Sequence, residues 1–308
     1  MATSEAVVST AVGQRRSLRR RDTKIAFLML APALILLSIF VIWPLIYAWG
    51  VSFYTWSFYQ PSVFVGLRNF RLVLEDPNFS ASIVRGLNYT LIVVPSILTI
   101  AFLFANVVKM VGTKAATFLK VSIYIPTVIS GVIASIIFVL IYEFRQGLLN
   151  WLLSFFGVAN QPWLGSAETA LYALTVPGIW MGLGLASLIM LAGLLDIPEE
   201  YYEAAEIDGA GWFARTFHIT IPLMKNIILF LLVTGFVASI QQFELPLVMT
   251  SGGPVRSTQL PNLLIFQHFT TDLYVGYSIA GALLLFLVLG GISAVIFKLV
   301  SSEKAVDA

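Results

Sequence analysis

The chain has 308 residues, of which 58% are hydrophobic and only 11% are charged. Soluble domains carry about 25% charged residues, so a water-soluble fold could not bury this much apolar surface, whereas a lipid bilayer accommodates it. The net charge of +2 is too small to indicate nucleic-acid binding, and the lack of cysteine excludes disulfides and thiolate chemistry. With only two histidines, a histidine-based metal cluster is not expected either.

Six long stretches carry no charge or almost none, and each is long enough to cross a membrane as a helix, which takes about 20 residues. Their continuous apolar character is unlike the alternating pattern of about ten residues per strand in a membrane barrel. The sequence therefore predicts an all-α integral membrane protein with about six transmembrane helices. No cleavable signal peptide is expected, because the first stretch is too long and lacks a small-residue cleavage site. The six predicted spans are Ile25–Tyr47, Gly86–Val108, Val121–Tyr142, Thr169–Leu195, Asn226–Met249 and Tyr277–Phe297.

Basic residues are concentrated before the first span and in every second loop. By the positive-inside rule, both termini and the loop 196–225 are predicted to be cytoplasmic. We expect 1–23 to be a basic cytoplasmic segment, 24–300 to be one transmembrane domain and 301–308 to be a cytoplasmic tail. A tail that binds nucleic acid or phospholipid is the alternative for the run of basic residues at the N-terminus. The positive-inside rule alone is enough to explain these basic residues. The residues on this side are Arg15, Arg16, Arg19, Arg20, Arg21, Lys24, Lys109, Lys114, Lys120, Arg215, Lys225, Lys298 and Lys304.

The loop between the fourth and fifth spans has a composition unlike the rest of the chain. Pro198 suits a helix start, acidic residues there complement the helix dipole, and Gly209 and Gly211 end the helix. The acids are Asp196, Glu199, Glu200, Glu203, Glu206 and Asp208. The pattern predicts a short surface helix shaped to dock in another protein's groove. An amphipathic helix lying on the membrane is the alternative, but it would carry a basic polar face.

This loop resembles the EAA motif of ABC importer permeases. Glu203-Ala204-Ala205, Gly209, Ile219 and Pro222 stand at that motif's spacing, and Asp208-Gly209-Ala210 and Thr250–Pro254 resemble the carbohydrate branch, the MalF-like permeases. Asn226 departs from the family, where many members have proline. The resemblance implies a type I ABC importer permease fold in a bacterial or archaeal plasma membrane, with binding-protein-dependent sugar transport. It also implies a coupling loop at about 196–222 that docks on an ATPase subunit through Glu203, Ala204, Ala205, Asp208, Gly209 and Ala210.

The chain has no Gly-x-x-x-x-Gly-Lys-Ser/Thr phosphate-binding pattern. We therefore expect a transport subunit rather than an enzyme, with no cofactor of its own and with ATP and Mg bound by partner subunits. The resemblance implies a second homologous permease, two ABC ATPase subunits and an extracytoplasmic solute-binding protein. Sugar and membrane lipid complete the expected partners, and nucleic acid is not among them.

Polar and small residues in the fifth span mark the expected substrate site. Gly235, Ser239 and Gln242 follow an i, i+4, i+7 spacing, so in a continuous helix they would share one face with Ala238. MalF-like permeases contact sugar from these positions and from the glycine-rich part of the fourth span, which here holds Gly178, Gly182 and Leu185. Packing between helices is the alternative, because small residues let membrane helices approach closely.

Two rival functions remain open at this stage. A permease for glycerol-3-phosphate, an amino sugar or a polyol belongs to the same family. A phosphorylated substrate would favour Arg or Lys in the pathway, and the predicted spans contain neither, which favours a neutral sugar. An ion-coupled secondary transporter would need acids within the membrane, and only Glu244 qualifies. We expect half of a translocation pathway for a sugar or oligosaccharide, coupled to ATP hydrolysis on a partner.

Overall fold

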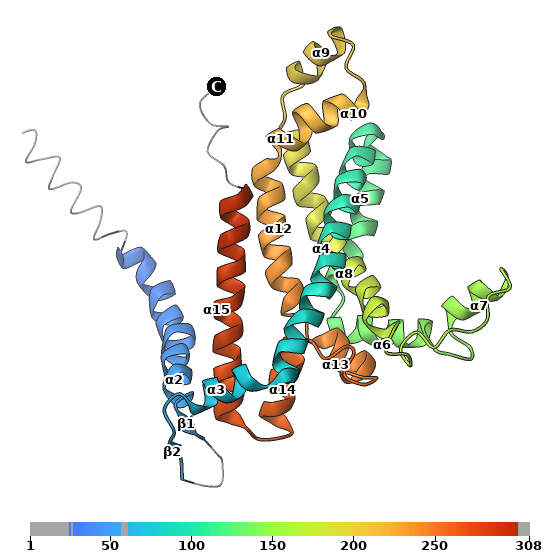
Figure 1. The fold of residues 1–308 in the computed structure, drawn as a ribbon. Helices are drawn as coiled ribbons and strands as arrows, with labels where there is room; N and C mark the ends of the chain where they lie inside the picture. The colour runs from blue at the N-terminus through green and yellow to red at the C-terminus, as the bar shows by residue number, and fades with distance from the viewer. Residues whose placement is uncertain (1–24, 26, 57–60, 301–308) are drawn as a thin grey trace, which may run out of the picture.

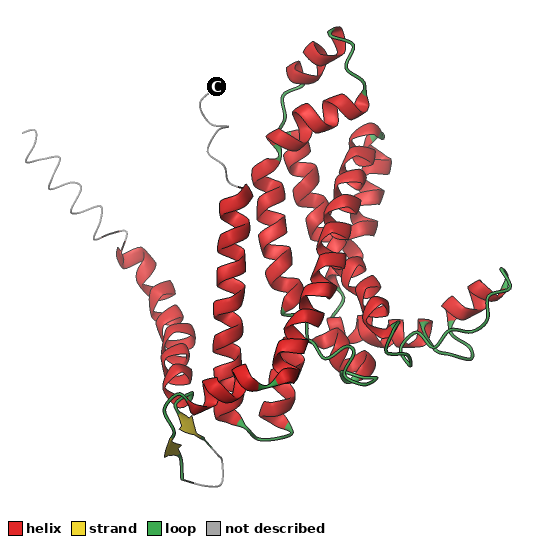
Figure 2. Cartoon of the chain, viewed as in Figure 1, coloured by secondary structure: helices red, strands yellow, loops and turns green. Residues whose placement is uncertain are grey.

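The computed structural model describes residue 25, residues 27–56 and residues 61–300. The predicted terminal segments 1–23 and 301–308 lie outside the described residues. The described part is an all-α bundle of long apolar helices, with one small antiparallel pair of strands, β1 (Tyr54–Thr55) and β2 (Val63–Phe64) (Figure 2). The fold class predicted from the sequence is confirmed.

Among the described residues, five helical segments are long and apolar enough to cross a membrane, and the number is six if one bent helix pair counts as a single span. The first segment, Phe27–Val51, includes η1 (Ser38–Ile42) and α2 (Trp43–Val51). The others are α4 (Pro77–Met110), the pair α5 (Thr113–Val128) and α6 (Gly131–Ile141), α8 (Ala170–Leu195), α12 (Lys225–Ile240) with α13 (Glu244–Thr250), and α15 (Val275–Val300). The remaining helices are α3 (Arg68–Glu75), α7 (Leu148–Ser154), α9 (Glu200–Ile207), α10 (Trp212–Arg215), η2 (Thr216–Thr220), α11 (Ile221–Leu223) and α14 (Pro261–Thr270).

The third span is not the continuous helix that the sequence predicted. Helices α5 and α6 meet at an angle of 98°. Pro126 lies in the last turn of α5, and Ile129 and Ser130 have extended backbone angles. The extended backbone of these two residues interrupts the helical hydrogen-bond pattern, so α5 ends at Val128 and α6 begins at Gly131.

The helix of the second span begins nine residues before the predicted start of the span at Gly86. Helix α4 starts at Pro77, where the Asp76 carboxylate caps it by accepting the Asn78 N–H at 2.8 Å. Arg85, which the sequence analysis left outside the span, therefore lies within α4. At 34 residues α4 is longer than the about 20 that a crossing needs, so its start does not place Arg85 in the apolar core, and the lack of Arg and Lys in the spans stays a prediction.

Helices α4, α8 and α12 form the centre of the bundle (Figure 1). One buried cluster joins Ala101 and Ala105 of α4 to Met190 and Leu194 of α8. Alanines at this interface let the two helices approach closely. The first span, by contrast, has none of its most apolar window buried within this chain.

The two ends of the bundle carry different elements. Helices α9, α10 and α11 lie at one end, whereas α3, the strands, α6, α7, α13 and α14 lie at the other (Figure 1). The start of the first span and the end of α15 point toward the end that carries α9. We call the end that carries α9 the coupling end and the opposite end the outer end, after the roles and the orientation that the sequence predicts.

Candidate substrate cavity and coupling surface

A cavity of about 540 Å³ lies between α4, α5, α8 and α12. Every position predicted to bind substrate lines it: Gly235, Ala238, Ser239 and Gln242 from the fifth span, and Gly178, Gly182 and Leu185 from the fourth. The remaining lining residues are Tyr89, Val93, Val94, Ile97, Leu98, Thr127, Met181, Ala186, Ile189, Phe230, Leu231 and Thr234. Residues from distant parts of the sequence thus surround one hollow.

The cavity wall is mostly apolar with a few hydroxyl and amide groups. Thr127 Oγ1 donates to the Met181 carbonyl at 3.1 Å, and Thr234 Oγ1 donates to the Phe230 carbonyl at 2.7 Å. Such hydroxyls keep lone pairs that can accept a further hydrogen bond. Pockets for small molecules commonly combine apolar walls with a few placed polar groups, so the wall suits a ligand with both C–H faces and hydroxyls.

Tyr89 is a lining residue that sequence reasoning missed. Its side chain is 1% exposed, and its hydroxyl is hydrogen-bonded to Gln242 and lies against Gly178. A Cβ at Gly178 would collide with this hydroxyl. A tyrosine inside the apolar run of the second span was the available signal, because its hydroxyl needs a partner when it is buried.

Gln242 reaches the cavity in a different way from that predicted. Helix α12 ends at Ile240, so Gln242 does not continue the face shared by Gly235 and Ser239. Its Oε1 accepts the backbone N–H groups of Phe243 at 2.8 Å and Glu244 at 3.2 Å. Gln242 therefore caps α13 at the break in the fifth span, next to the cavity.

Glycines determine how close the cavity walls come. A Cβ at Gly182 would be 2.5 Å from Ile97 Cδ1, and a Cβ at Gly235 would be 3.5 Å from Val94. Leu185, in contrast, is exposed, so its side chain has room to move. A side chain added at Gly182 would therefore collide with Ile97 unless the Ile97 side chain moved.

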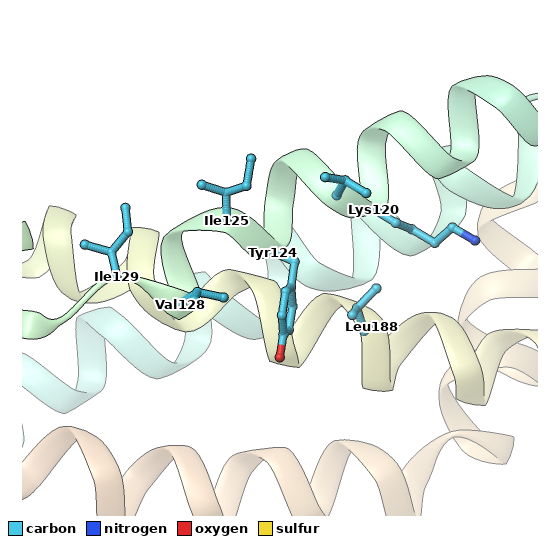
Figure 3. A pocket seen from close by; sticks show the side chains of 7 residues that line it. Lys120, Tyr124, Ile125, Val128, Ile129 and Leu188 are labelled. Carbon is cyan, nitrogen blue, oxygen red and sulfur yellow. The ribbon is translucent and has the colours of Figure 1, made fainter.

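A second hollow lies on a different face of α5 and shares no residue with the cavity. It is an open groove lined by Lys120, Val121, Tyr124, Ile125, Val128, Ile129 and Leu188 (Figure 3). Its aliphatic wall has one charged and one phenolic side chain, and it lacks the clustered hydroxyl and amide groups of the cavity. The cavity is the better candidate for a hydroxyl-rich ligand.

The predicted docking residues lie on and after α9 at the coupling end. Glu203, Ala204, Asp208 and Gly209 are exposed, and Ala205 and Ala210 are partly exposed. Gly209 has φ +74°, a left-handed conformation in which L side chains are strained. The Ala210 N–H donates to the Ala205 carbonyl at 2.8 Å across this turn, as in the glycine-containing ends of many helices.

Side-chain contacts tie α9 to the membrane helices. Lys109, in the last turn of α4, pairs with Glu199 at 2.8 Å, and its Nζ lies 4.7 Å from the centre of the Tyr202 ring. The Tyr202 hydroxyl is 3.0 Å from Thr220 Oγ1. Arg215 and Glu206 form a further ion pair at 3.3 Å. These contacts hold the face of α9 that is directed toward the membrane helices. The opposite face of α9 is exposed.

Glu244, whose role the sequence left open, lies at the outer end. Its carboxylate packs against Gly131, the first residue of α6. A carboxylate near a helix N-terminus is favoured by the helix dipole. In this structure Glu244 therefore links the break in the fifth span to the break in the third.

Comparisons with known proteins agree with this architecture. Residues 77–303 match the family described as the inner membrane component of binding-protein-dependent transport systems. The trehalose/maltose permease MalF of Thermococcus litoralis is 32% identical over 83% of this chain and 87% of its own length. The sulfoquinovosyl glycerol permease SmoG of Agrobacterium fabrum is 31% identical over 92% of each chain.

The fold also matches a solved importer. A crystal structure of a bacterial ABC transporter involved in import of the acidic polysaccharide alginate aligns with a TM-score of 0.78 at 21% identity, over 94% of this chain and 99% of that one. With the family match, the apolar helices and the cavity, these findings identify a multi-pass inner-membrane protein. The chain belongs to the family of binding-protein-dependent transport system inner membrane components, as a permease subunit of a carbohydrate ABC importer.

Proposed function

We propose that this subunit forms half of a saccharide pathway and transmits ATP-driven movement to it through α9. In this proposal ATP and Mg are bound by two partner ATPase subunits, and a second homologous permease completes the pathway. An extracytoplasmic solute-binding protein delivers the saccharide at the outer end. Both termini, including 1–23 and 301–308, and the loop 196–222 are then cytoplasmic, as the basic residues indicate.

The observation that carries the proposal is a direct connection between the docking helix and the cavity. The loop containing α9 joins the end of α8 to the start of α12, and both of these helices line the cavity. Lys109 adds a third connection, because α4 also lines the cavity. A displacement of α9 would therefore move three cavity walls together.

The open face of α9 has the character of a protein-binding surface. Ile207, the last residue of α9, is 88% exposed, and Phe213 of the neighbouring α10 is 72% exposed, although both are large apolar residues. Exposed apolar groups next to acidic side chains are typical of interaction sites. Glu203 and Asp208 supply the acidic groups on this surface.

The proposed substrate is a saccharide that contacts Ser239, Gln242, Ala238 and Gly235 on one side of the cavity and Gly182 and Leu185 on the other. The wall's mixture of apolar surface and hydroxyls supports this ligand class. Relatives named for the transport of trehalose or maltose, sulfoquinovosyl glycerol and arabinooligosaccharides also support it. Residues beyond this chain complete the site, because the pathway is shared.

Reconstitution tests the proposal. The two permeases and two ATPases are placed in proteoliposomes, and import of labelled saccharide is measured with the binding protein and ATP present. We expect import to require ATP and both permeases, and to fall when Ala204→Trp places a bulky group on α9. Ser80→Trp at the exposed outer end of α4 is the control and should leave ATP-dependent import intact.

Two results would contradict the proposal. The first is saccharide import by this subunit alone or driven by an ion gradient without ATP. The second is unchanged import with Ala204→Trp, since that would mean that nothing docks on α9.

A further inference from the structure

The hydroxyl of Tyr89 lies where three parts of the cavity wall meet. Tyr89 comes from α4, Gly178 from α8 and Gln242 from the break after α12, and all three residues line the cavity. The hydroxyl oxygen is so close to Gly178 that a Cβ at that position would collide with it. The same hydroxyl is hydrogen-bonded to the Gln242 side chain. A polar group from the second span is therefore placed at the cavity surface.

Packing holds the ring of Tyr89 in one position. The ring belongs to a buried cluster that includes Leu174 of α8 and Leu245 of α13, both fully buried. A Cβ at Gly178 would also be 3.7 Å from Leu245 Cδ1, so this leucine closes the same corner of the cavity. Protein interiors are close-packed, and a ring enclosed in this way has little freedom to turn. A ligand that binds the hydroxyl would therefore not need to order this side chain first.

The hydrogen bonds of Gln242 indicate the direction of its contact with Tyr89. Gln242 Oε1 accepts the backbone N–H groups of Phe243 and Glu244 at 2.8 and 3.2 Å. Because the amide oxygen is engaged, the amide nitrogen is the group that donates to the Tyr89 hydroxyl oxygen. A phenolic hydroxyl both accepts and donates, so its own hydrogen remains to be given to an acceptor.

Two other tyrosines show how such a hydrogen is satisfied within the protein. The Tyr142 hydroxyl donates to the Ala173 carbonyl at 3.0 Å, and the Tyr277 hydroxyl donates to Asp76 at 2.6 Å. Tyr89 is more deeply buried than Tyr142, yet no acceptor for its hydroxyl hydrogen lies among the described residues. Buried tyrosine hydroxyls usually have a partner, because an unmade hydrogen bond in a buried place is costly.

We infer that the Tyr89 hydroxyl donates a hydrogen bond to a hydroxyl oxygen of the transported saccharide, with the Gln242 amide beside it as a second donor. Sugar hydroxyl oxygens have two lone pairs, so one such oxygen can accept from both groups. This inference rests on the proposed saccharide pathway and adds to it a recognition residue from the second span.

The contact makes Tyr89 a specificity-determining residue. A site that hydrogen-bonds a substrate hydroxyl strongly rejects the analogue without it, because the buried polar groups of the site are then left unpaired. The neighbouring wall, formed by Val93, Val94 and Ile97, is apolar and cannot make this distinction. One particular hydroxyl of the saccharide should therefore be required for tight binding.

Binding to the complete transporter in nanodiscs tests the inference. Maltose, trehalose, cellobiose and galactobiose are screened, and the sugar that binds most tightly is compared with its monodeoxy derivatives. We expect the wild-type complex to bind at least one derivative about tenfold more weakly than the parent sugar. In Tyr89→Phe, which removes only the hydroxyl, the parent sugar should bind about tenfold more weakly, and most of the penalty for that derivative should disappear. Such coupling between one protein hydroxyl and one sugar hydroxyl is expected of groups in contact.

Tyr142→Phe is the matched control. It also removes a buried tyrosine hydroxyl, but this hydroxyl donates to the Ala173 carbonyl and Tyr142 does not line the cavity. We expect a lower melting temperature, with unchanged affinity for the parent sugar and an unchanged penalty for the deoxy derivative. Melting curves show whether Tyr89→Phe is folded, and the comparison of derivatives on the wild-type complex does not depend on any variant.

The inference is overturned if every monodeoxy derivative binds the wild-type complex as tightly as the parent sugar, or if Tyr89→Phe keeps full affinity. It is also overturned if Tyr89→Phe weakens the parent sugar and all derivatives by the same factor, because that would indicate packing rather than contact with one hydroxyl. If no saccharide binds the wild-type complex and none stimulates ATP hydrolysis, the proposed function itself fails.

Discussion

Lys109 and Glu199 form a 2.8 Å ion pair that fixes the start of the α9 loop to the end of α4. The same Lys109 ammonium lies over the Tyr202 ring. The pair therefore joins the exposed coupling surface to a helix that lines the cavity. Through this contact a displacement of α9 would also move α4. The covalent chain already connects the α9 loop to α8 and α12.

Charge exchange tests the importance of this ion pair. Lys109→Glu places two carboxylates together, and we expect saccharide-stimulated ATP hydrolysis to fall several-fold. The double variant Lys109→Glu/Glu199→Lys restores opposite charges and should recover most of the stimulation. Partly exposed pairs contribute about 1 kcal/mol or less to stability, so the melting temperature should change little. A double variant as impaired as the single one would count against the ion pair.

Gly209 provides a test of the turn that ends α9. Because its φ is +74°, Gly209→Val should strain the turn by at least about 1 kcal/mol and strongly reduce stimulated ATP hydrolysis. Gly209→Asn is the matched control, since asparagine tolerates this conformation, and it should retain most of the activity. Equal loss in both variants would show that side-chain size, not backbone conformation, is the cause.

The contact between Tyr89 and Gly178 predicts a compensating pair of substitutions. Gly178→Ala collides with the Tyr89 hydroxyl, so we expect a lower melting temperature and weaker saccharide binding. Tyr89→Phe/Gly178→Ala removes the colliding oxygen and should recover part of the stability. Melting curves in detergent and equilibrium binding in nanodiscs measure the two effects. Independent, additive losses would contradict the contact.

Ser239 tests the ligand role of the cavity wall. Its side chain is nearly buried and lines the cavity, so Ser239→Ala removes a hydroxyl available to a sugar. We expect about five- to tenfold weaker binding with little change in stability, in line with a hydrogen bond of about 1 kcal/mol. Ser187→Ala is the control, because Ser187 is buried in α8 but does not line the cavity. The same loss in both variants would indicate packing rather than ligand contact.

Asp76 predicts a pH effect at the outer end. Burial opposes its ionisation, but hydrogen bonds from Tyr277 at 2.6 Å and from Asn78 outweigh burial and lower the pKa of its carboxyl below 3.8. A lowered pKa means that this contribution to stability is present above pH 3.8 and is lost as the pH falls through the lower, folded-state value. Asp76→Asn should reduce stability at neutral pH and remove this step from the stability profile. A variant that keeps the acid step would assign it to another group.

The lengths of the apolar runs predicted most of the membrane-spanning helices. Two helix boundaries were predicted wrongly, and each error has a physical cause. The break after Val128 was hidden because Ile129, Ser130 and Gly131 continue the apolar run without a charge. The early start of α4 was missed because Arg85 ended the run, although Asp76-Pro77 is a readable helix-start signal. Charge thus marked where the apolar stretch ended, but it did not mark where the helix ended.

The candidate site was predictable only in part. Gly235 and Ala238 follow helical spacing in the fifth span, and Gly178 and Gly182 do so in the fourth, so each pair could be placed on one helix face from the sequence. Tyr89 belongs to another span, and its contact with Gly178 depends on how α4 packs on α8. The position of Gln242 depends on where α12 ends. The Tyr89–Gly178 contact and the position of Gln242 arise from tertiary packing. The spacing of residues along one helix does not specify that packing.

Cross-linking at α9 tests the central claim most directly, and the absence of native cysteine makes it clean. A single cysteine is introduced as Ala204→Cys on α9 or, as the control, as Ser80→Cys at the outer end, and each complex is treated with a short thiol–amine cross-linker. The account predicts a cross-link from position 204 to the ATPase subunit whose yield changes with ATP, and none from position 80. No cross-link from position 204 in a complex that still imports saccharide with ATP would contradict it.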